Sequence, residues 1–287
     1  MDKPVDTSKL WLSYEDRMDR VVTYIHDHLD EELDLMTLAA VACLSPHHWH
    51  RIYAAMKGET IAQTVRRLRL ARAARDLMAT KLPIADVARK SGYPNLQSFS
   101  RVFSEHYGMP PAQYRKEGNH VPFEHATAQR IISMFDVTIK DAPAMTLAGV
   151  PHKGDYMAIS KSFERTFGAL SAQDLASHMR GMVGVYYDDP DAVLEAELRS
   201  FAGAVLAEEA DLAAPLDKLD VPAGRVAVLH YKGPYAAMKP AYDWLYGTWL
   251  PQSGEEVRDA PAYEIYLNNP EDTAPQDLLT DIHMPLR

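Results

Sequence analysis

The sequence predicts a multi-domain protein in which an all-α, double helix-turn-helix domain is followed by an α+β domain. Three observations predict this fold class. Apolar residues recur at helical spacing in two units between residues 35 and 115, a strand-helix-strand-strand pattern occurs twice between residues 143 and 285, and the charge changes sign between these regions. Residues 35–117 carry 13 Lys and Arg against 5 Asp and Glu, a net +8, whereas residues 118–287 carry 13 against 25, a net −12. The basic region is therefore expected to face nucleic-acid phosphates.

The first helical unit consists of two short amphipathic helices separated by a break. Leu35, Leu38 and Ala42 repeat at helical spacing, and the break follows at Leu44-Ser45-Pro46. Ser45 is a favoured N-cap and Pro46 a favoured first helical residue. The next helix has an apolar side made of Trp49, Ile52, Tyr53 and Met56. At about 100° per residue, its opposite side presents His47, His50 and Arg51, with His48 on the flank.

The second helical unit repeats this plan. Ile84, Val87 and Ala88 predict a short helix, Gly92-Tyr93-Pro94 predicts the turn, and the following helix buries Phe99, Val102, Phe103 and Tyr107. Its outward side presents Gln97, Ser98, Arg101 and Ser104. Arg pairs with guanine O6/N7 and Gln with adenine N6/N7, so these side chains suit a helix in the major groove.

Two motifs give this region a family resemblance. The run Ser98-Phe99-Ser100-Arg101-Val102-Phe103 and the ending Gly108-Met109-Pro110-Pro111-Ala112-Gln113-Tyr114-Arg115 resemble the AraC family of transcription regulators, over roughly residues 17–117. The resemblance implies that two recognition helices read double-stranded promoter DNA. The implied contacts are His47, His48, His50 and Arg51 in the first helix and Asn95, Gln97, Ser98 and Arg101 in the second. The histidine-rich first helix departs from the commoner family pattern, so no operator sequence is carried over.

Other residues of this region have more than one interpretation. Arg66, Arg67, Arg69, Arg72 and Arg75 of the connecting helix either face phosphates or form a solvated face, with Arg66 and Arg72 the more structural pair. His47 and His50 have metal-ligand spacing, but no third ligand stands near them in the sequence, so we expect no metal and no cofactor. The one cysteine, Cys43, is expected to fill the core.

The domain boundary is predicted where helical periodicity stops. We expect a DNA-binding domain over residues 1–117, a linker over 118–129 and a second domain over 130–287. The segment that begins at Pro143 resembles the one that begins at Pro222, and both contain a Lys-Gly-x-Tyr turn. Each copy continues with a helix, roughly residues 155–170 and 235–250, and with two strands: 182–187 and 198–206, then 262–267 and 281–285. These units predict an antiparallel sheet with helices on one side and a concave pocket on the other.

The second domain resembles the GyrI-like effector-binding domain, and the order of the domains resembles a Rob-type architecture. The motifs that carry the resemblance are the two Lys-Gly-x-Tyr turns, the run 242–251 and the run 261–268. It implies that the glutamate matching Glu264 points into an aromatic cavity that meets cationic ligands. The residues themselves agree, because Glu264 and Tyr266 alternate onto one face of a strand. The candidate ligand-binding residues are Tyr156, Tyr235, Trp244, Trp249, Glu264 and Tyr266.

These observations favour a cytoplasmic transcription regulator that binds a promoter and senses a small apolar or cationic effector, not an enzyme. Two alternatives stay open: Glu264 acts as the general base of a hydrolase, or the acidic second domain contacts another protein such as RNA polymerase without a ligand. No membrane segment is expected, because no apolar run approaches about 20 residues. Either a monomer or a homodimer is compatible with two DNA-reading units in one chain.

Overall fold

The computed structural model describes residues 7–117, 135–208 and 210–287. By their contacts, the described residues of 12–43 and 57–129 form one unit, and those of 1–11, 44–56 and 130–287 form the other. Residues 44–56, which the sequence assigns to the first domain, thus group with the C-terminal residues. The predicted linker, 118–129, lies outside the described residues, as do residues 130–134. No helix in the described part is long and apolar enough to cross a membrane.

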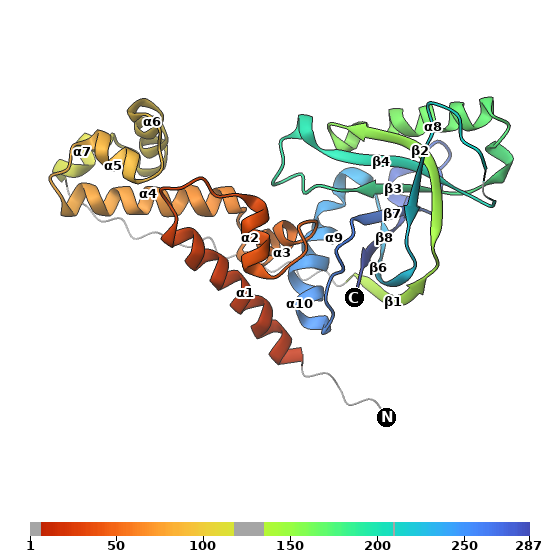
Figure 1. The fold of residues 1–287 in the computed structure, drawn as a ribbon, viewed down its shortest axis with the longest axis horizontal. Helices are drawn as coiled ribbons and strands as arrows, with labels where there is room; N and C mark the ends of the chain where they lie inside the picture. Colours follow the sequence, from red (N-terminus) through yellow and green to blue (C-terminus); the bar gives the residue numbers. More distant parts are fainter. Residues whose placement is uncertain (1–6, 118–134, 209) are drawn as a thin grey trace. The chain divides into compact units, whose positions relative to one another are not determined.

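The first unit is helical, as predicted. Its helices are α1 (Thr7–Asp27), α2 (Leu35–Ala42), α4 (Ile61–Ala79), α5 (Ile84–Lys90), α6 (Leu96–Tyr107) and α7 (Pro111–Glu117). Figure 1 shows α5, α6 and α7 gathered at the C-terminal end of α4. Leu70 and Leu77 of α4, Val87 of α5 and Phe99 and Phe103 of α6 are fully buried in one cluster. This cluster is the core that the apolar spacing predicts for the second helix-turn-helix.

Side-chain caps fix where these helices begin. The Asp34 carboxylate accepts from the Thr37 backbone N–H at 2.9 Å, and the Asn95 side chain accepts from that of Ser98 at 2.7 Å. Thr60 and Gln63 form a reciprocal capping box at the start of α4. The prediction for Cys43 is wrong, because Cys43 follows α2 in a left-handed conformation (φ 52°) that leaves its side chain exposed.

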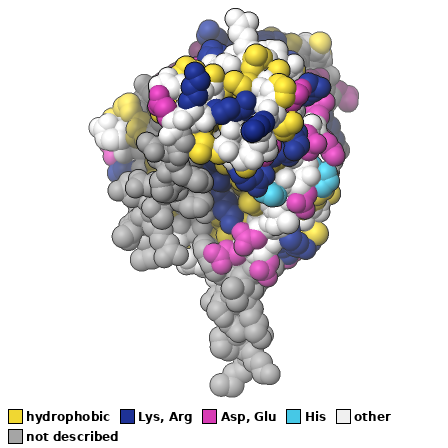
Figure 2. Space-filling model, turned by 90° about the vertical axis from the view of Figure 1, so that its left-hand side faces the viewer, with side chains coloured by type: hydrophobic (Ala, Val, Ile, Leu, Met, Phe, Trp, Pro, Cys, Tyr) yellow, Lys and Arg dark blue, Asp and Glu magenta, His cyan; other side chains and the backbone are white. Residues whose placement is uncertain are grey.

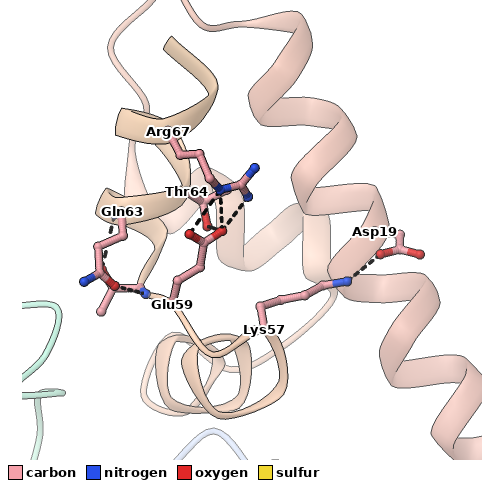
Figure 3. A network of polar contacts seen from close by, with 7 residues as sticks. Asp19, Lys57, Glu59, Gln63, Thr64 and Arg67 are labelled. Carbon is pink, nitrogen blue, oxygen red and sulfur yellow. Dashed lines mark hydrogen bonds and ion pairs between the residues drawn. The ribbon is translucent and has the colours of Figure 1, made fainter. Parts of the chain in front are cut away.

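A polar network holds the first turn of α4 (Figure 3). The Glu59 carboxylate accepts from Thr64 Oγ1 at 2.9 Å and from the Arg67 guanidinium at 2.5 Å. Nearby, Lys57 donates to the Asp19 carboxylate of α1 at 2.6 Å. These contacts tie α1 and the start of α4 to the intervening turn.

The second unit contains an eight-stranded antiparallel sheet in the order β1-β6-β8-β7-β3-β4-β2-β5 (Figure 1). Its strands are β1 (Asp136–Ala142), β2 (Met145–Lys153), β3 (Met179–Tyr186), β4 (Arg199–Leu206), β5 (Asp217–Val221), β6 (Gly224–Lys232), β7 (Ala262–Tyr266) and β8 (Leu279–Pro285). The sequence repeat is confirmed: β2, β3 and β4 form one half, and β6, β7 and β8 form the other. The halves meet at β3 and β7, where Gly184 pairs with Glu264 and Val185 with Tyr263.

Each half contributes helical structure between its first and second strands. In the first half a 3-10 turn (Tyr156–Ala158) leads into α8 (Ser160–Ala172). In the second half a 3-10 turn (Tyr235–Ala237) leads into α9 (Lys239–Trp244), a π-helical turn (Leu245–Trp249) and α10 (Leu250–Ser253). Leu170 of α8 packs on Ala148, Val150 and Ala204 of the sheet. Each 3-10 turn begins two residues after the glycine of a Lys-Gly pair, as the repeat predicts.

The expected position of the pocket is wrong. The cavity lies on the helical face of the sheet, because residues of α8 and α9 and same-face strand residues line it together. The opposite face is filled by its own side chains, among them Leu147, Val183, Phe201 and Tyr263. The sequence shows which strand residues share a face but not which face the helices leave open.

We predict that Gly92→Ala destabilises the helical unit by about 1–3 kcal/mol more than Gly108→Ala does. Both glycines have positive φ, 76° and 72°. A Cβ at Gly92 would lie 2.6 Å from the Arg69 guanidinium and from the Leu29 carbonyl oxygen, whereas a Cβ at Gly108 meets no atom within 4 Å. Calorimetric unfolding of the two variants measures the difference, and equal losses would contradict this account of the turn.

Candidate functional site

A cavity of about 1010 Å³ lies between the two helical segments of the second unit, above β3 and β7. Aromatic and apolar side chains form most of its wall: Tyr156, Ile159, Phe163, Phe167, Met182, Tyr186, Tyr235, Met238, Tyr242 and Tyr266. This volume is at the upper end of the range for small-molecule sites. Nine charged side chains also line the cavity, three of them cationic, and Glu264 is the most buried of the nine at 6% exposed.

Three tyrosines surround the Glu264 carboxylate. Tyr242 Oη donates to Oε1 at 2.7 Å, Tyr266 Oη donates to Oε2 at 2.9 Å, and Tyr186 Oη lies 2.6 Å from Tyr266 Oη. Gly184 is directly opposite Glu264 on β3, where a Cβ would lie 2.8 Å from Tyr266 Oη. The tyrosine hydroxyls therefore supply the hydrogen bonds that a buried carboxylate needs, and the glycine leaves room for them.

Burial sets the protonation of this cluster. It raises the pKa of Glu264 above the ordinary value of 4.5, although the hydrogen bonds from Tyr242 and Tyr266 and the nearby Arg51 oppose the shift. Burial also raises the pKa of Tyr156 to about 12 and holds the pKa of Tyr242 well above 10. The tyrosines are thus neutral donors at physiological pH, which favours a carboxylate as their acceptor.

The structure brings together four of the six predicted ligand-binding residues. Tyr156, Tyr235, Glu264 and Tyr266 line the cavity, whereas Trp244 and Trp249 are not among its lining residues. The ring of Trp244 instead packs edge-on against Phe135, with 5.7 Å between centroids. Sequence reasoning missed Tyr186 and Tyr242, although Tyr186 has the strand parity that identifies Glu264 and Tyr266.

The helix predicted to read DNA first, α3 (Trp49–Lys57), begins three residues later than expected, after a turn at residues 46–48. Its apolar side is buried as predicted at Trp49, Ile52 and Tyr53. The residues just before the helix contact the C-terminal residues of the same unit. Ser45 Oγ donates to Asp259 Oδ1 at 2.8 Å, and His47 Nδ1 lies 3.4 Å from the Tyr187 carbonyl oxygen.

His48 is 1% exposed, and both of its ring nitrogens are used. Nε2 lies 2.7 Å from the Ala260 carbonyl oxygen, which can only accept, so Nε2 donates and Nδ1 accepts from Tyr246 Oη at 2.9 Å. Burial, and then the charge of Arg51, lowers the pKa of His48 to about 3. Burial lowers the pKa of His50 to about 4, and its ring packs on Trp49. Both histidines are therefore neutral in this arrangement.

Arg51 reaches the cavity. Its guanidinium lies over the ring of Tyr242, with Cζ 4.8 Å from the centroid, and 5.7 Å from the centroid of Tyr246. Its Nη2 donates to the Asp188 carbonyl oxygen at 3.0 Å, and the side chain is part of the cavity wall. In this arrangement His48 and Arg51 contact protein groups rather than an open surface.

The second helix predicted to read DNA, α6, presents its predicted side outward. Asn95, Gln97 and Arg101 are exposed and Ser98 is half-buried. Asn95 also caps the helix, and Arg101 lies 3.7 Å from Glu105. Figure 2 shows Lys and Arg side chains gathered on the face formed by α4 to α7.

Most arginines of α4 bond to the protein. Arg66 pairs with Glu105, Arg67 with Glu59, and Arg69 donates to the Leu29 and Glu31 carbonyl oxygens at 2.8 and 2.9 Å. Arg72 donates to the Lys90 carbonyl oxygen. Arg115 of the closing motif donates to the Leu82 carbonyl oxygen at 2.7 Å, so this motif residue anchors α7 to the turn after α4. Arg75 stays largely exposed.

Comparison with known protein families gives two matches. The model of a GyrI-like small molecule binding domain matches residues 135–287, more than half of the chain, and a helix-turn-helix domain model matches residues 38–117. The helix-turn-helix match lies within the predicted domain 1–117, and the GyrI-like match lies within the predicted domain 130–287.

Three similar curated proteins are regulators by name. Regulatory protein SoxS of Salmonella typhimurium is 30% identical over 104 residues, which are 36% of this chain and 97% of SoxS. Transcriptional regulator Rob of the same organism is 28% identical over 145 residues, which are 50% of this chain and 49% of Rob. The uncharacterized HTH-type transcriptional regulator YbfP of Bacillus subtilis is 33% identical over 102 residues, 36% of this chain and 35% of YbfP. The chain therefore spans about half of Rob and a third of YbfP.

We predict that Glu264→Gln stabilises the protein at pH 7.5 and that the gain shrinks as the pH falls toward 4. The raised pKa of Glu264 means that the folded state retains its proton to a higher pH than the unfolded state does. This group therefore favours folding at low pH and disfavours it once the pH rises above the folded pKa. A rise in melting temperature of roughly 2–4 °C at pH 7.5 corresponds to about 1 kcal/mol in a domain of this size. A variant that is less stable at pH 7.5 would contradict the prediction.

Proposed function

The chain belongs to the family of proteins with a GyrI-like small molecule binding domain, here behind an AraC-type helix-turn-helix domain, and on this basis we propose that it is a transcription regulator that senses a lipophilic cation. The observation that carries the proposal is the buried Glu264 carboxylate in a cavity walled by tyrosine rings. Promoter DNA and a small-molecule effector are the proposed partners.

The chemistry of the cavity favours a cation with apolar substituents. Glu264 supplies a negative charge away from bulk water, where electrostatic attraction is stronger than at the surface. The rings of Tyr156 and Tyr235 in the cavity wall supply apolar contact area and a π-system for cation–π attraction. An anion near Glu264 would be repelled by the carboxylate, and a strongly hydrated small ion would lose water that the rings do not replace.

The proposed DNA contacts are the eight residues that the family resemblance implies. In the second recognition helix, Asn95, Gln97, Ser98 and Arg101 lie on the outward side of α6, and nothing in the described helical unit covers Gln97 or Arg101. In the first, the contacts of His47, His48, His50 and Arg51 with the C-terminal residues have to be exchanged for DNA. Regulation then follows from linkage between DNA and ligand.

We predict that Glu264→Gln weakens the binding of tetraphenylphosphonium at least tenfold but changes the binding of neutral triphenylphosphine oxide by less than about threefold. The substitution removes the charge and retains the size of the side chain, and tenfold corresponds to about 1.4 kcal/mol. Calorimetric titration at pH 7.5 measures both affinities. An equal loss for both compounds would show that Glu264 acts by shape rather than by charge. Recovery of chemically changed ligand would indicate a hydrolase instead.

We predict that Arg101→Ala costs about 1–3 kcal/mol of binding to a specific site and relaxes the preference at one base position. Arg101 is exposed on α6 and its carboxylate neighbour, Glu105, is on the same helix. Binding-site selection on a randomised duplex measures the preference, with Arg89→Ala as an exposed arginine control outside α6. An unchanged base preference would remove Arg101 from the reading residues.

A further inference from the structure

Arg51 and Glu264 both contact the side chain of Tyr242 in the cavity. The ring face of Tyr242 lies under the Arg51 guanidinium, and the hydroxyl of the same residue donates to Glu264 Oε1. The positive charge from residues 44–56 is therefore held beside a carboxylate that accepts hydrogen bonds from two tyrosine hydroxyls. The charge of Arg51 is also one of the influences that opposes the raised pKa of Glu264.

Arg51 is surrounded by the same kinds of groups, aromatic rings and oxygen acceptors, that the cavity presents to a cationic ligand. The guanidinium meets two tyrosine ring faces and the Asp188 carbonyl oxygen, and the side chain is part of the cavity wall. Asp188 is itself fixed, because its carboxylate pairs with Arg199 at 2.7 Å. A second cation near Glu264 would be placed close to Arg51 in a site with little water, where like charges repel strongly.

Residues 44–56 fit closely on the C-terminal residues. Gly247, in the π-helical turn, faces Ala55 of α3, and a Cβ at Gly247 would lie 2.5 Å from Ala55 Cβ and 2.8 Å from its carbonyl carbon. Ser45 and His48 add hydrogen bonds at the other end of the segment. The same polar side of this segment is the one proposed to enter a major groove, and a guanidinium that lies on Tyr242 is not available to a base.

We propose that Arg51 is the resident cation beside Glu264 in the cavity, and that a lipophilic cation and DNA both favour the state in which residues 44–56 have left the C-terminal fold. The inference rests on the proposed function, and it specifies that the coupling between cation binding and DNA binding is positive. A cation at Glu264 displaces Arg51 and frees the first recognition helix, so cation and DNA strengthen each other's binding. Arg51 is thus a selectivity residue of the cavity that the DNA-binding domain contributes.

The first test measures ligand affinity in the full chain. Arg51→Met removes the charge and retains an unbranched apolar stem, and we expect it to bind tetraphenylphosphonium at least fivefold more tightly than the wild type. Triphenylphosphine oxide should bind both proteins within twofold, because it carries no charge to be repelled. Arg165→Met is the matched control, since Arg165 is exposed on α8 and does not line the cavity.

The second test measures DNA affinity at fixed salt, using a duplex from the protein's own promoter. Tetraphenylphosphonium should raise the affinity of the wild type at least fivefold. Gly247→Ala separates α3 from the π-helical turn, so it should bind DNA tightly without the cation and respond to it less than twofold. Tyr246→Phe keeps the ring and removes the hydroxyl that contacts His48 and Arg51, so it should shift DNA affinity in the same direction by a smaller factor.

The outcomes separate the two proposals. If the wild type binds the cation and Arg51→Met binds it no more tightly, or if the cation lowers DNA affinity, the inference is wrong and the proposed function stands. If the cation binds and leaves DNA affinity unchanged, the inference and the proposed linkage between DNA and ligand are both wrong. If neither protein binds any of the probe, the proposed function is wrong and the inference falls with it. Tighter cation binding by Arg51→Met together with a DNA affinity that rises with the cation supports both.

Discussion

The site depends on keeping one carboxylate charged, or ready to become charged, away from water. An unpaired buried carboxylate is unstable, and a salt bridge in its place would leave no attraction for a ligand. Tyr242 and Tyr266 resolve this conflict because they satisfy both carboxylate oxygens with neutral donors. The hydrogen bonds stabilise the ion, and the charge remains uncompensated by a directly bonded cation. Much of the surrounding architecture, including the pairing of β3 with β7 and the position of α9, brings these hydroxyls to Glu264.

Local patterns predicted the elements of the fold because each element obeys a short-range rule. The spacing of Phe99 and Phe103 shows the buried side of α6, and the alternation of Glu264 and Tyr266 shows a shared strand face. The edge strands β1 and β5 were missed because all of their side chains are exposed or half-buried and each strand has only a short apolar alternation, Val137 and Ile139 in β1 and Leu219 and Val221 in β5. Each edge strand also pairs with the half that it does not adjoin in the sequence. Strand β1 precedes β2 but pairs with β6, and β5 precedes β6 but pairs with β2.

Long-range choices could not be predicted in the same way. Amphipathicity identifies the polar side of α3 but not the partner of that side, and here Arg51 and His48 find tyrosines almost 200 residues away in the sequence. The tryptophans were expected at the cavity because they are large and aromatic, yet the packing of Trp244 on Phe135 depends on a contact that no periodicity shows. The DNA contacts stay predictions, since only the outward orientation of α6 bears on them.

Gly184 makes the charge distribution in the cavity asymmetric. The two halves of the sheet place equivalent tyrosines, Tyr186 and Tyr266, in hydrogen-bond contact across their junction, and Gly184 occupies the position in β3 that Glu264 occupies in β7. The aromatic walls are therefore nearly two-fold, but the charge is not. The cation of the proposed function would be drawn from the junction toward β7, the half that also holds Tyr242. Even in a tetrahedral molecule with four identical substituents, the substituents would then lie in different surroundings. The pocket would thus bind a symmetric ligand in an asymmetric way.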